Sequence, residues 1–338
     1  MGGSPCPVPR PRGLDPSRPR GRHGEARLRR ILVTGSNGMI GRALVRALSM
    51  QSVRVVRFDL DHQRDDRGDI RDRRDVERAI VGCDGVIHLA AVSRIEPAEA
   101  DPDTCVATNV SGTQAIVQAA LAVPSPPWVV FASSREVYGD VEALPATEAT
   151  PRRPRNVYGQ SKLEAERAIE AAAAAGLPTA IVRLSNVYGS IHDHPSRVIP
   201  AFTRAAHMGL PLIIRGADST LDFVHRDDVV RGLLAVAERL SMTRASLPPV
   251  QLVSGFATTL GDLATLTVRL ARSNSRIHIE PPQSVNVRAF VGSNVLACRE
   301  LGWTCQTQLE VGVMQMLEDF RQHARATHPQ RKEHGCAS

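Results

Sequence analysis

Tyr158 and Lys162 are spaced four residues apart in the segment NVYGQSK, and both residue types are rare in this chain. The 338 residues include three tyrosines and two lysines against forty arginines. A spacing of four places both side chains on one face of a helix. A tyrosine, with an ordinary pKa of about 10, acts as a base at neutral pH only if its phenolate is stabilised. Lysine offers a compact charge with three donors, so the pair predicts a proton-transfer site beside a ribose.

A glycine-rich turn provides a second chemical signal. Gly35, Gly38 and Gly41 are spaced three apart in TGSNGMIG, between an apolar segment and an apolar-periodic one. A strand–turn–helix of this kind lets the backbone approach a pyrophosphate closely, and the helix N-terminus attracts its negative charge. The turn therefore predicts a dinucleotide site.

Asp59 closes the next apolar segment, 18 residues after Gly41. A carboxylate there binds the adenosine ribose hydroxyls and repels a 2′-phosphate, which favours NAD over NADP. Asp69 and Ile70 fall where an adenine edge would lie, although an exposed loop is the alternative. Three nearby cations leave NADP open: Arg57, Arg64 and Arg67.

Alternating strands and helices must position these residues. We expect short, near-continuously apolar strands at 29–33, 53–58, 85–90, 127–134 and 179–185. Helices are expected at 39–49, 72–80, 102–122 and 158–175. This alternation predicts an α/β fold with a Rossmann-type doubly wound parallel sheet, followed by a smaller, mixed α/β C-terminal substrate lobe.

The same pattern predicts the domain organisation. The ranges are a disordered tail at 1–28, an NAD-binding Rossmann domain at 29–190 to which part of 216–240 returns, a substrate-binding lobe at 191–325 and a frayed tail at 326–338.

The net charge of +7 lies almost entirely at the N-terminus. Residues 1–30 hold eight arginines against two acids, a net of +6, so the other 308 residues are near +1. This Pro-, Gly- and Arg-rich segment lacks interleaved aromatics, so we interpret it as a disordered extension, with a nucleic-acid-binding arm as the alternative.

Several classes of protein do not fit the composition. No apolar run approaches the roughly 18–20 residues of a membrane span, and the N-terminus lacks the apolar core of an export signal. The six cysteines form no CxxC and no regular spacing. We therefore expect a cytoplasmic protein with reduced thiols, no metal site, no membrane partner and no nucleic-acid partner.

Ordered motifs connect these signals. They are TGSNGMIG at 34–41, HLAA at 88–91, TNVSGT at 108–113, SSREVYG at 133–139, YGQSK at 158–162, RLSNVYG at 183–189 and DFVHRDDVV at 222–230, with LGW at 301–303. On these motifs the chain, over about residues 29–320, resembles the extended short-chain dehydrogenase/reductases. The resemblance is specifically to NAD-dependent nucleotide-sugar epimerases and dehydratases, such as UDP-glucose 4-epimerase.

The resemblance implies roles for individual residues. Ser134 would hydrogen-bond the reacting sugar oxygen, Tyr158 would be the base and Lys162 would hold the ribose. Glu136 is a further catalytic candidate. The NAD-binding candidates are Gly35, Asn37, Gly38, Met39, Ile40, Gly41, Asp59, Asp69, Ile70, Leu89, Ala90, Ala91, Asn109, Tyr158 and Lys162. The substrate-binding candidates are Ser93, Arg94, Ser134, Arg135, Asn186, Arg197, Arg215 and Arg288. His88 is interpreted as a packed strand histidine.

Two departures from the family pattern affect the expected reaction. Dehydratases and decarboxylases of the family carry a glutamate where Glu136 stands, but dTDP-glucose dehydratases place an aspartic acid before it, where this chain has Arg135. Glu136 also has a purely structural interpretation, as the partner of Arg135 or Arg155. Leu221 replaces an arginine that contacts phosphates or a carboxylate in many relatives, so Arg215, Arg197 or Arg288 would take over.

The resulting expectation is an epimerase acting on a UDP-, dTDP- or GDP-sugar, at C4, through a transient 4-keto intermediate. The alternative is a dehydratase (4,6- or 5,6-) or decarboxylase that uses Glu136. A non-enzymatic NAD-binding sensor is a more remote alternative. The small-residue segment EAAAAAG (170–176) favours a homodimer through close helix packing.

Overall fold

A six-stranded sheet forms the centre of the structure, a computed structural model that describes residues 28–61, 67–281 and 287–327. Its strands, in the order in which they lie side by side, are β10 (Val250–Leu252), β5 (Thr179–Leu184), β4 (Trp128–Ser134), β3 (Gly85–His88), β1 (Arg30–Thr34) and β2 (Arg54–Phe58). All five pairings are parallel. The central strands are buried on both faces, as their continuous apolar sequences predict.

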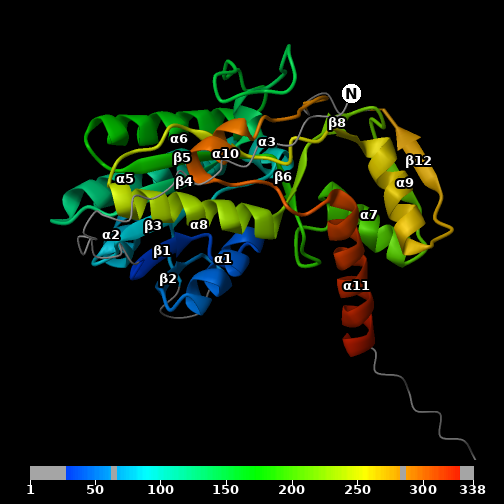
Figure 1. Ribbon diagram of the computed structural model, residues 1–338, viewed down its shortest axis with the longest axis horizontal. Helices are drawn as coiled ribbons and strands as arrows, with labels where there is room; N and C mark the ends of the chain where they lie inside the picture. Colours follow the sequence, from blue (N-terminus) through cyan, green and yellow to red (C-terminus); the bar gives the residue numbers. More distant parts are fainter. Residues whose placement is uncertain (1–27, 62–66, 282–286, 328–338) are drawn as a thin grey trace, which may run out of the picture.

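Helices cover both faces of this sheet (Figure 1). One face carries α1 (Met39–Met50), α8 (Arg226–Thr243) and α10 (Val295–Leu301) over one hydrophobic core. The other face carries α2 (Arg73–Ile80), α5 (Gly112–Ala122) and α6 (Val157–Ala174) over a second core. Helices on both faces of a parallel sheet confirm the predicted Rossmann-type fold class.

The strand order reverses between β1 and β3. From β1 the chain moves outward to β2 and then crosses to β3 on the other side of β1. Ligands of open α/β sheets bind at the carboxyl ends of the strands beside such a reversal. Three of the signals from the sequence (the glycine turn, HLAA and SSREVYG) follow β1, β3 and β4 at this edge.

The helical segment expected at 102–122 is divided into three parts. It consists of α4 (Pro102–Val106), a π-helical turn at Ala107–Ser111 and α5, and it follows α3 (Ile95–Ala100). A π turn often marks a functional site, and this one contains Asn109.

A second region with its own core lies beside the sheet (Figure 1). Its helices are α7 (Val198–His207), α9 (Leu260–Ala271) and α11 (Leu309–Thr327). Its strands pair as β7 (Leu212–Arg215) with β12 (Ile277–Glu280), and β8 (Thr220–Leu221) with β11 (Thr258–Thr259). Strands β6 (Asn186–Tyr188) and β9 (Phe223–His225) form a further parallel pair.

The observed boundaries differ from the predicted domain ranges in several places, one of which is α10, inside the expected substrate lobe in sequence but packed on the main sheet. Strand β10 lies inside the expected substrate lobe in sequence but joins the edge of the main sheet beside β5. Leu28, assigned to the N-terminal tail, is buried in the first core. Helix α11 continues to Thr327, into the expected frayed end. The remaining residues assigned to the two tails lie outside the described residues.

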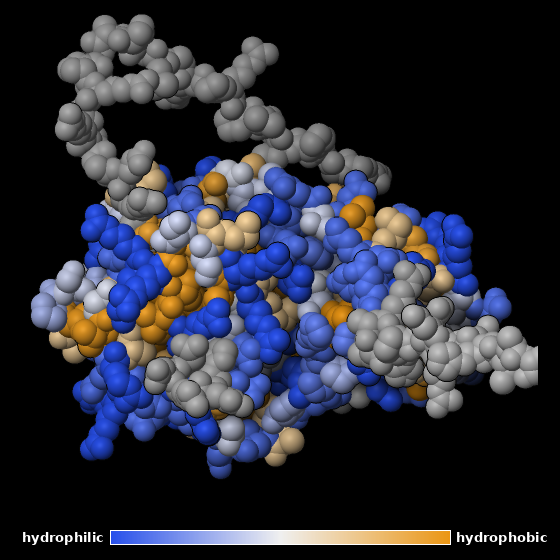
Figure 2. All heavy atoms as spheres, turned by 90° about the horizontal axis from the view of Figure 1, so that it is seen from below, coloured by the Kyte–Doolittle hydropathy of each residue, from blue (hydrophilic) through white to orange (hydrophobic). Residues whose placement is uncertain are grey.

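The surface is largely hydrophilic on the face shown in Figure 2, and its broadest apolar area lies over the half that holds the six-stranded sheet. Within the described residues, no helix is both long enough and apolar enough to cross a bilayer. Residues 170–176, at the end of α6, are mostly exposed. The homodimer and the cytoplasmic location stay predictions.

Candidate active site

A cavity of about 390 Å³ lies at the carboxyl ends of the central strands. Residues that follow β1, β3, β4 and β5 line it from the sheet side, and residues of the second region close it from the other side. The cavity therefore lies where the strand reversal predicts a ligand.

The glycine turn forms a cradle with no room for side chains. Gly35 has φ +67°, and an added Cβ would stand 2.7 Å from the Ala90 nitrogen. A Cβ on Gly41 would overlap the Gly35 carbonyl oxygen. Gly38 is the N-cap of α1 and has no side chain, so the cap residue itself leaves the N-terminus of this helix open. This close backbone approach and open helix end fit the pyrophosphate of NAD.

Asp59 is held beside the cradle. Its Oδ2 accepts from the Asn37 backbone nitrogen at 2.9 Å, and its Oδ1 accepts from the Asp61 nitrogen at 3.1 Å. The carboxylate thus stands where a strand-ending acid meets the adenosine ribose in dinucleotide-binding folds.

Asp69 and Ile70 lie apart from the cavity. The Asp69 carboxylate binds Arg71 through contacts of 2.7–3.0 Å, and this hydrogen bonding lowers the pKa of Asp69. Ile70 is buried in the second core, and a Cβ on Gly112 would stand 2.9 Å from its side chain. The adenine role of Asp69 and Ile70 stays a prediction.

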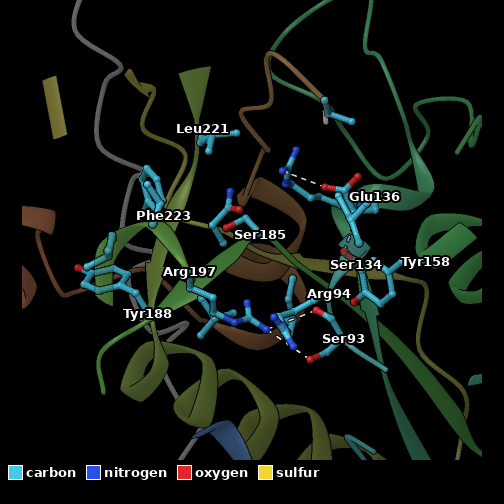
Figure 3. Close-up of a pocket in the computed structure, with 18 of the residues that line it drawn as sticks. Ser93, Arg94, Ser134, Glu136, Tyr158, Ser185, Tyr188, Arg197, Leu221 and Phe223 are labelled. Atoms are coloured by element: carbon cyan, nitrogen blue, oxygen red, sulfur yellow. Dashed lines mark hydrogen bonds and ion pairs between the residues drawn. The ribbon is translucent and has the colours of Figure 1, made fainter. Parts of the chain in front are cut away.

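Ser134, Tyr158 and Lys162 meet at one wall of the cavity. Ser134 ends β4, and the other two lie in the first turns of α6. Figure 3 shows Ser134 and Tyr158 side by side. The Ser134 Oγ accepts from the Glu136 nitrogen at 3.2 Å, which leaves the Ser134 hydroxyl proton to donate toward Tyr158 or a sugar oxygen.

Lys162 is buried, with only 3% of its surface exposed. Its Nζ donates to the Ala132 carbonyl oxygen at 2.9 Å and lies 4.7 Å from the centre of the Phe131 ring. Burial lowers the pKa of Lys162 to about 8. A lysine has three N–H donors, so two remain for a ligand beyond the bond to Ala132.

The pKa of Tyr158 shifts in the opposite direction to that of Lys162. Burial raises its pKa to about 12, and the hydrogen bond from Ser134 and the charge of Arg197 act against this rise. The phenol is therefore neutral at pH 7 in the protein alone. Added positive charge near the hydroxyl would lower this pKa, which is what the oxidised nicotinamide of NAD brings.

Arg135 and Glu136 are engaged with each other at the same wall. Arg135 Nη2 lies 2.9 Å from Glu136 Oε1, and Asn156 Nδ2 donates to Glu136 Oε2 at 3.0 Å. The structural interpretation of Glu136, pairing with Arg135, is thus observed. Asn156 also caps α6 by accepting from the Gly159 nitrogen at 2.7 Å, so it connects Glu136 to the helix that carries Tyr158.

Two further arginines line the cavity next to Ser93 (Figure 3). Arg197 Nη2 donates to the Ser93 Oγ at 3.4 Å, and its Nε lies 3.3 Å from Asp193. Arg94 Nη1 lies 3.1 Å from the His194 ring. These guanidinium groups make this wall cationic.

The remaining predicted substrate residues lie around the cavity. Arg215 lines it but pairs with Glu280 at 2.9 Å, and Arg288 lines it with an exposed side chain. Asn186 Nδ2 donates to the Asp222 carbonyl at 3.0 Å. Leu221, which stands where many relatives have an arginine, contributes an apolar surface to the cavity.

Asn109 fixes the loop after β3 rather than lining the cavity. Its Oδ1 accepts from Val92 at 2.8 Å, and its Nδ2 donates to the Val92 carbonyl at 3.0 Å and to Ser161 at 2.9 Å. Asn109 therefore ties the loop that carries Ser93 to helix α6, as the π turn around it suggests.

His88 is a packed strand histidine, as interpreted. Its ring lies 2.7 Å from Thr34 Oγ1 and 3.0 Å from Thr113 Oγ1. Burial lowers its pKa to about 3, so the ring stays neutral.

Sequence reasoning did not identify Asn156 and Phe290. Asn156 carries a readable signal, because Asn three residues before Gly159 fits a helix cap. Phe290, over whose ring the Arg135 guanidinium lies at 5.5 Å, comes from a distant segment and carries none.

Comparisons with known proteins agree with this geometry. The family model "NAD dependent epimerase/dehydratase family" matches residues 31–245. A dTDP-glucose 4,6-dehydratase of Streptomyces griseus is 31% identical over 321 residues, covering 87% of this chain and 94% of that protein. A UDP-glucose 4-epimerase of Streptomyces lividans is 35% identical over 191 residues, covering 51% of this chain and 58% of that protein.

A solved structure, MoeE5 in complex with UDP-glucose and NAD, superposes with a TM-score of 0.80 at 29% identity, covering 87% of this chain and 99% of that one. MoeE5 has also been solved with UDP-glucuronic acid and NAD. The family match, the full-length relative and the cradle for NAD agree with one another. The chain therefore belongs to the NAD dependent epimerase/dehydratase family of enzymes, as its ordered motifs predict.

Proposed function

We propose that this protein is a nucleotide-sugar epimerase that inverts C4 through a transient 4-keto sugar. The observation that carries the proposal is the engagement of Glu136 by Arg135 and Asn156 through both of its carboxylate oxygens. With Glu136 held in this way, Tyr158 is the group at this wall that is placed to move a proton. A single proton-transfer group beside a hydride acceptor suffices for epimerisation.

In the proposed mechanism Tyr158, as phenolate, takes the proton of the sugar O4 while the C4–O4 bond becomes a carbonyl. Ser134 donates to this oxygen and keeps it in place. Lys162 holds the ribose with its two remaining donors and adds positive charge that favours the phenolate. The glycine cradle at Gly35–Gly41 would hold NAD, which would supply the acceptor for the C4 hydride and its donor for the return to the opposite face of C4 after the sugar turns. Tyr158 then gives its proton back to O4, so no group is consumed.

The pocket arginines (Arg94, Arg135, Arg197, Arg215 and Arg288) support a diphosphate in the substrate. Two carboxylates line the same cavity, Glu136 and the exposed Glu96. An excess of guanidinium groups suits a sugar linked to a nucleoside diphosphate. MoeE5 and the Streptomyces relatives act on or bind UDP- and dTDP-sugars by their names, so we propose UDP or dTDP ahead of GDP.

A dehydratase is the second candidate, because Glu136 lines the cavity and the full-length relative is a dTDP-glucose 4,6-dehydratase. Loss of water from C5 and C6 needs a base for the C5 proton and an acid for the leaving C6 hydroxyl. Arg135 cannot be that acid, since a guanidinium does not lose its proton in proteins. This favours the epimerase.

Product analysis tests the proposal. The purified protein with NAD is incubated with UDP-glucose, UDP-glucuronate, dTDP-glucose and GDP-mannose, and products are followed by mass spectrometry and proton NMR. A product of unchanged mass with an inverted C4 proton is expected. Loss of water would instead establish the dehydratase, and loss of carbon dioxide a decarboxylase.

A further inference from the structure

Arg135 has an unused donor inside the cavity. The residue is 9% exposed and lines the cavity, and its Nη2 is paired with Glu136 at 2.9 Å. Its Nη1 is buried without a hydrogen-bond partner among the described residues. A buried donor without an acceptor is costly, and the cost is higher on a charged group. A ligand in the cavity can supply the missing acceptor.

The guanidinium is also held in place. Glu136 holds one nitrogen, and Glu136 is itself fixed by Asn156 at 3.0 Å. The guanidinium lies over the buried Phe290 ring, with 5.5 Å between the Arg135 Cζ and the centre of the ring. Both contacts restrain the guanidinium group of Arg135, so its free Nη1 presents its N–H groups in one direction. A site that recognises a hydrogen-bond acceptor needs such a fixed orientation.

The position along the chain relates this donor to the reacting atoms. Arg135 directly follows Ser134, which hydrogen-bonds Tyr158 at the point where the reacting hydroxyl would lie. Ser134, Arg135 and Tyr158 line the same cavity, so we take the Arg135 guanidinium to meet substituents on a carbon adjacent to C4. In a pyranose these are the C3 hydroxyl and C6, which is attached to C5. Of the two, only C6 can carry a full negative charge, as a carboxylate.

We infer that Arg135 selects a nucleotide-hexuronic acid by donating from Nη1 to its C6 carboxylate. This inference rests on the proposed function, because it names the sugar that the epimerase takes. A planar guanidinium matches a carboxylate in geometry and charge, and a charge-assisted hydrogen bond is about twice as strong as a neutral one. A neutral C6 hydroxymethyl would accept from the same nitrogen more weakly.

The test compares UDP-glucuronate with UDP-glucose in the wild-type protein and in Arg135→Met. Wild-type kcat/KM is expected to favour the uronate by about tenfold to a hundredfold, from one charge-assisted contact. Arg135→Met should remove most of this preference by lowering kcat/KM for the uronate much more than for the neutral sugar. Equal use of both sugars by the wild type, or an unchanged preference in Arg135→Met, would overturn the inference.

Because Arg135→Met leaves Glu136 without its partner, the double variant Arg135→Met/Glu136→Gln is measured beside it. This double variant removes both charges and should show the same loss of preference. The control is Arg299→Met, which changes an exposed arginine on α10 that pairs with Glu300 and is not among the residues lining the cavity. It should keep the wild-type preference.

Direct binding separates failure of this inference from failure of the proposed function. Calorimetric titration of the NAD-loaded protein with each sugar nucleotide does not depend on turnover. If the products show dehydration or decarboxylation, the epimerase proposal fails. Tighter binding of UDP-glucuronate that is lost in Arg135→Met would still support the carboxylate contact, and equal binding of both sugars would refute it.

Discussion

The cofactor side and the sugar side of the cavity are built from different materials. On the cofactor side the backbone of Gly35–Gly41 forms the cradle, and Lys162 is anchored to the β4 backbone at Ala132. On the sugar side, long arginine side chains lie in ion pairs with Glu136, Asp193 and Glu280. A backbone cradle is fixed by the fold, whereas paired side chains can be exchanged singly. This difference explains how proteins with this fold can bind the same cofactor while they bind different sugars.

The largest effect is expected at the reacting wall. Tyr158→Phe removes the hydroxyl that moves the O4 proton, so turnover should fall by about 10²–10⁴-fold, the usual contribution of a general base. NAD content should stay at the wild-type level, because the cradle does not involve this hydroxyl. Turnover is measured by NMR, and NAD by its release on denaturation. Near-wild-type turnover would refute the assignment of Tyr158 as base.

Lys162→Met tests the anchored cation on the cofactor side. Folding lowers the pKa of Lys162 from about 10.5 to about 8, so the folded protein without NAD carries a destabilised charge at pH 7. Removing it should raise the free energy of unfolding by about 1–3 kcal/mol at pH 7 while abolishing activity. The measurement is urea denaturation of the NAD-free protein.

The sign of the pH dependence follows from the direction of this shift. Below pH 8 both folded and unfolded chains carry the proton, and the full penalty is present. Between about pH 8 and 10 the unfolded chain binds more protons, so wild-type stability rises with pH relative to Lys162→Met. If the difference in unfolding free energy between Lys162→Met and the wild type does not become smaller over this pH interval, Lys162 is not a buried, charged lysine with a lowered pKa.

The sequence predicted the cofactor side better than the sugar side. The roles predicted for Gly35, Tyr158 and Lys162 rest on short spacings within one segment, which a sequence pattern can show. Arg135 pairs with the adjacent Glu136, which the sequence raised only as an alternative because adjacency alone does not establish an ion pair. Its other contact, the Phe290 ring, comes from a distant segment and was not indicated. The placement of β10 in the main sheet was also missed, because three apolar residues between polar loops carry too little pattern.

Glu136→Gln tests whether Glu136 positions Arg135 or acts as a base. Glutamine keeps the shape and the contact to Asn156 but loses the charge opposite Arg135. As a positioning residue, Glu136 should contribute about tenfold to kcat/KM, the effect of one weakened charged hydrogen bond. The pH profile of kcat should keep its shape. A loss of 10²-fold or more, with a changed acid limb, would identify Glu136 as a base and favour the dehydratase.

The smallest effects are expected among the arginines, and they differ by exposure. The Arg197 side chain is 33% exposed, and its charge helps to lower the Tyr158 pKa, so Arg197→Met should raise KM about threefold to tenfold. Loss of this charge also raises the pKa of the Tyr158 phenol. The increase in rate that accompanies phenolate formation should therefore move to higher pH.

Arg215 is 54% exposed in a surface pair with Glu280. Such pairs contribute about 0–1 kcal/mol, so Arg215→Met should change KM less than about fivefold and leave the pH profile in place. Steady-state kinetics from pH 6 to 10 measure both variants side by side. A larger effect at Arg215 than at Arg197 would assign the substrate diphosphate to the second region rather than to the wall beside Ser93.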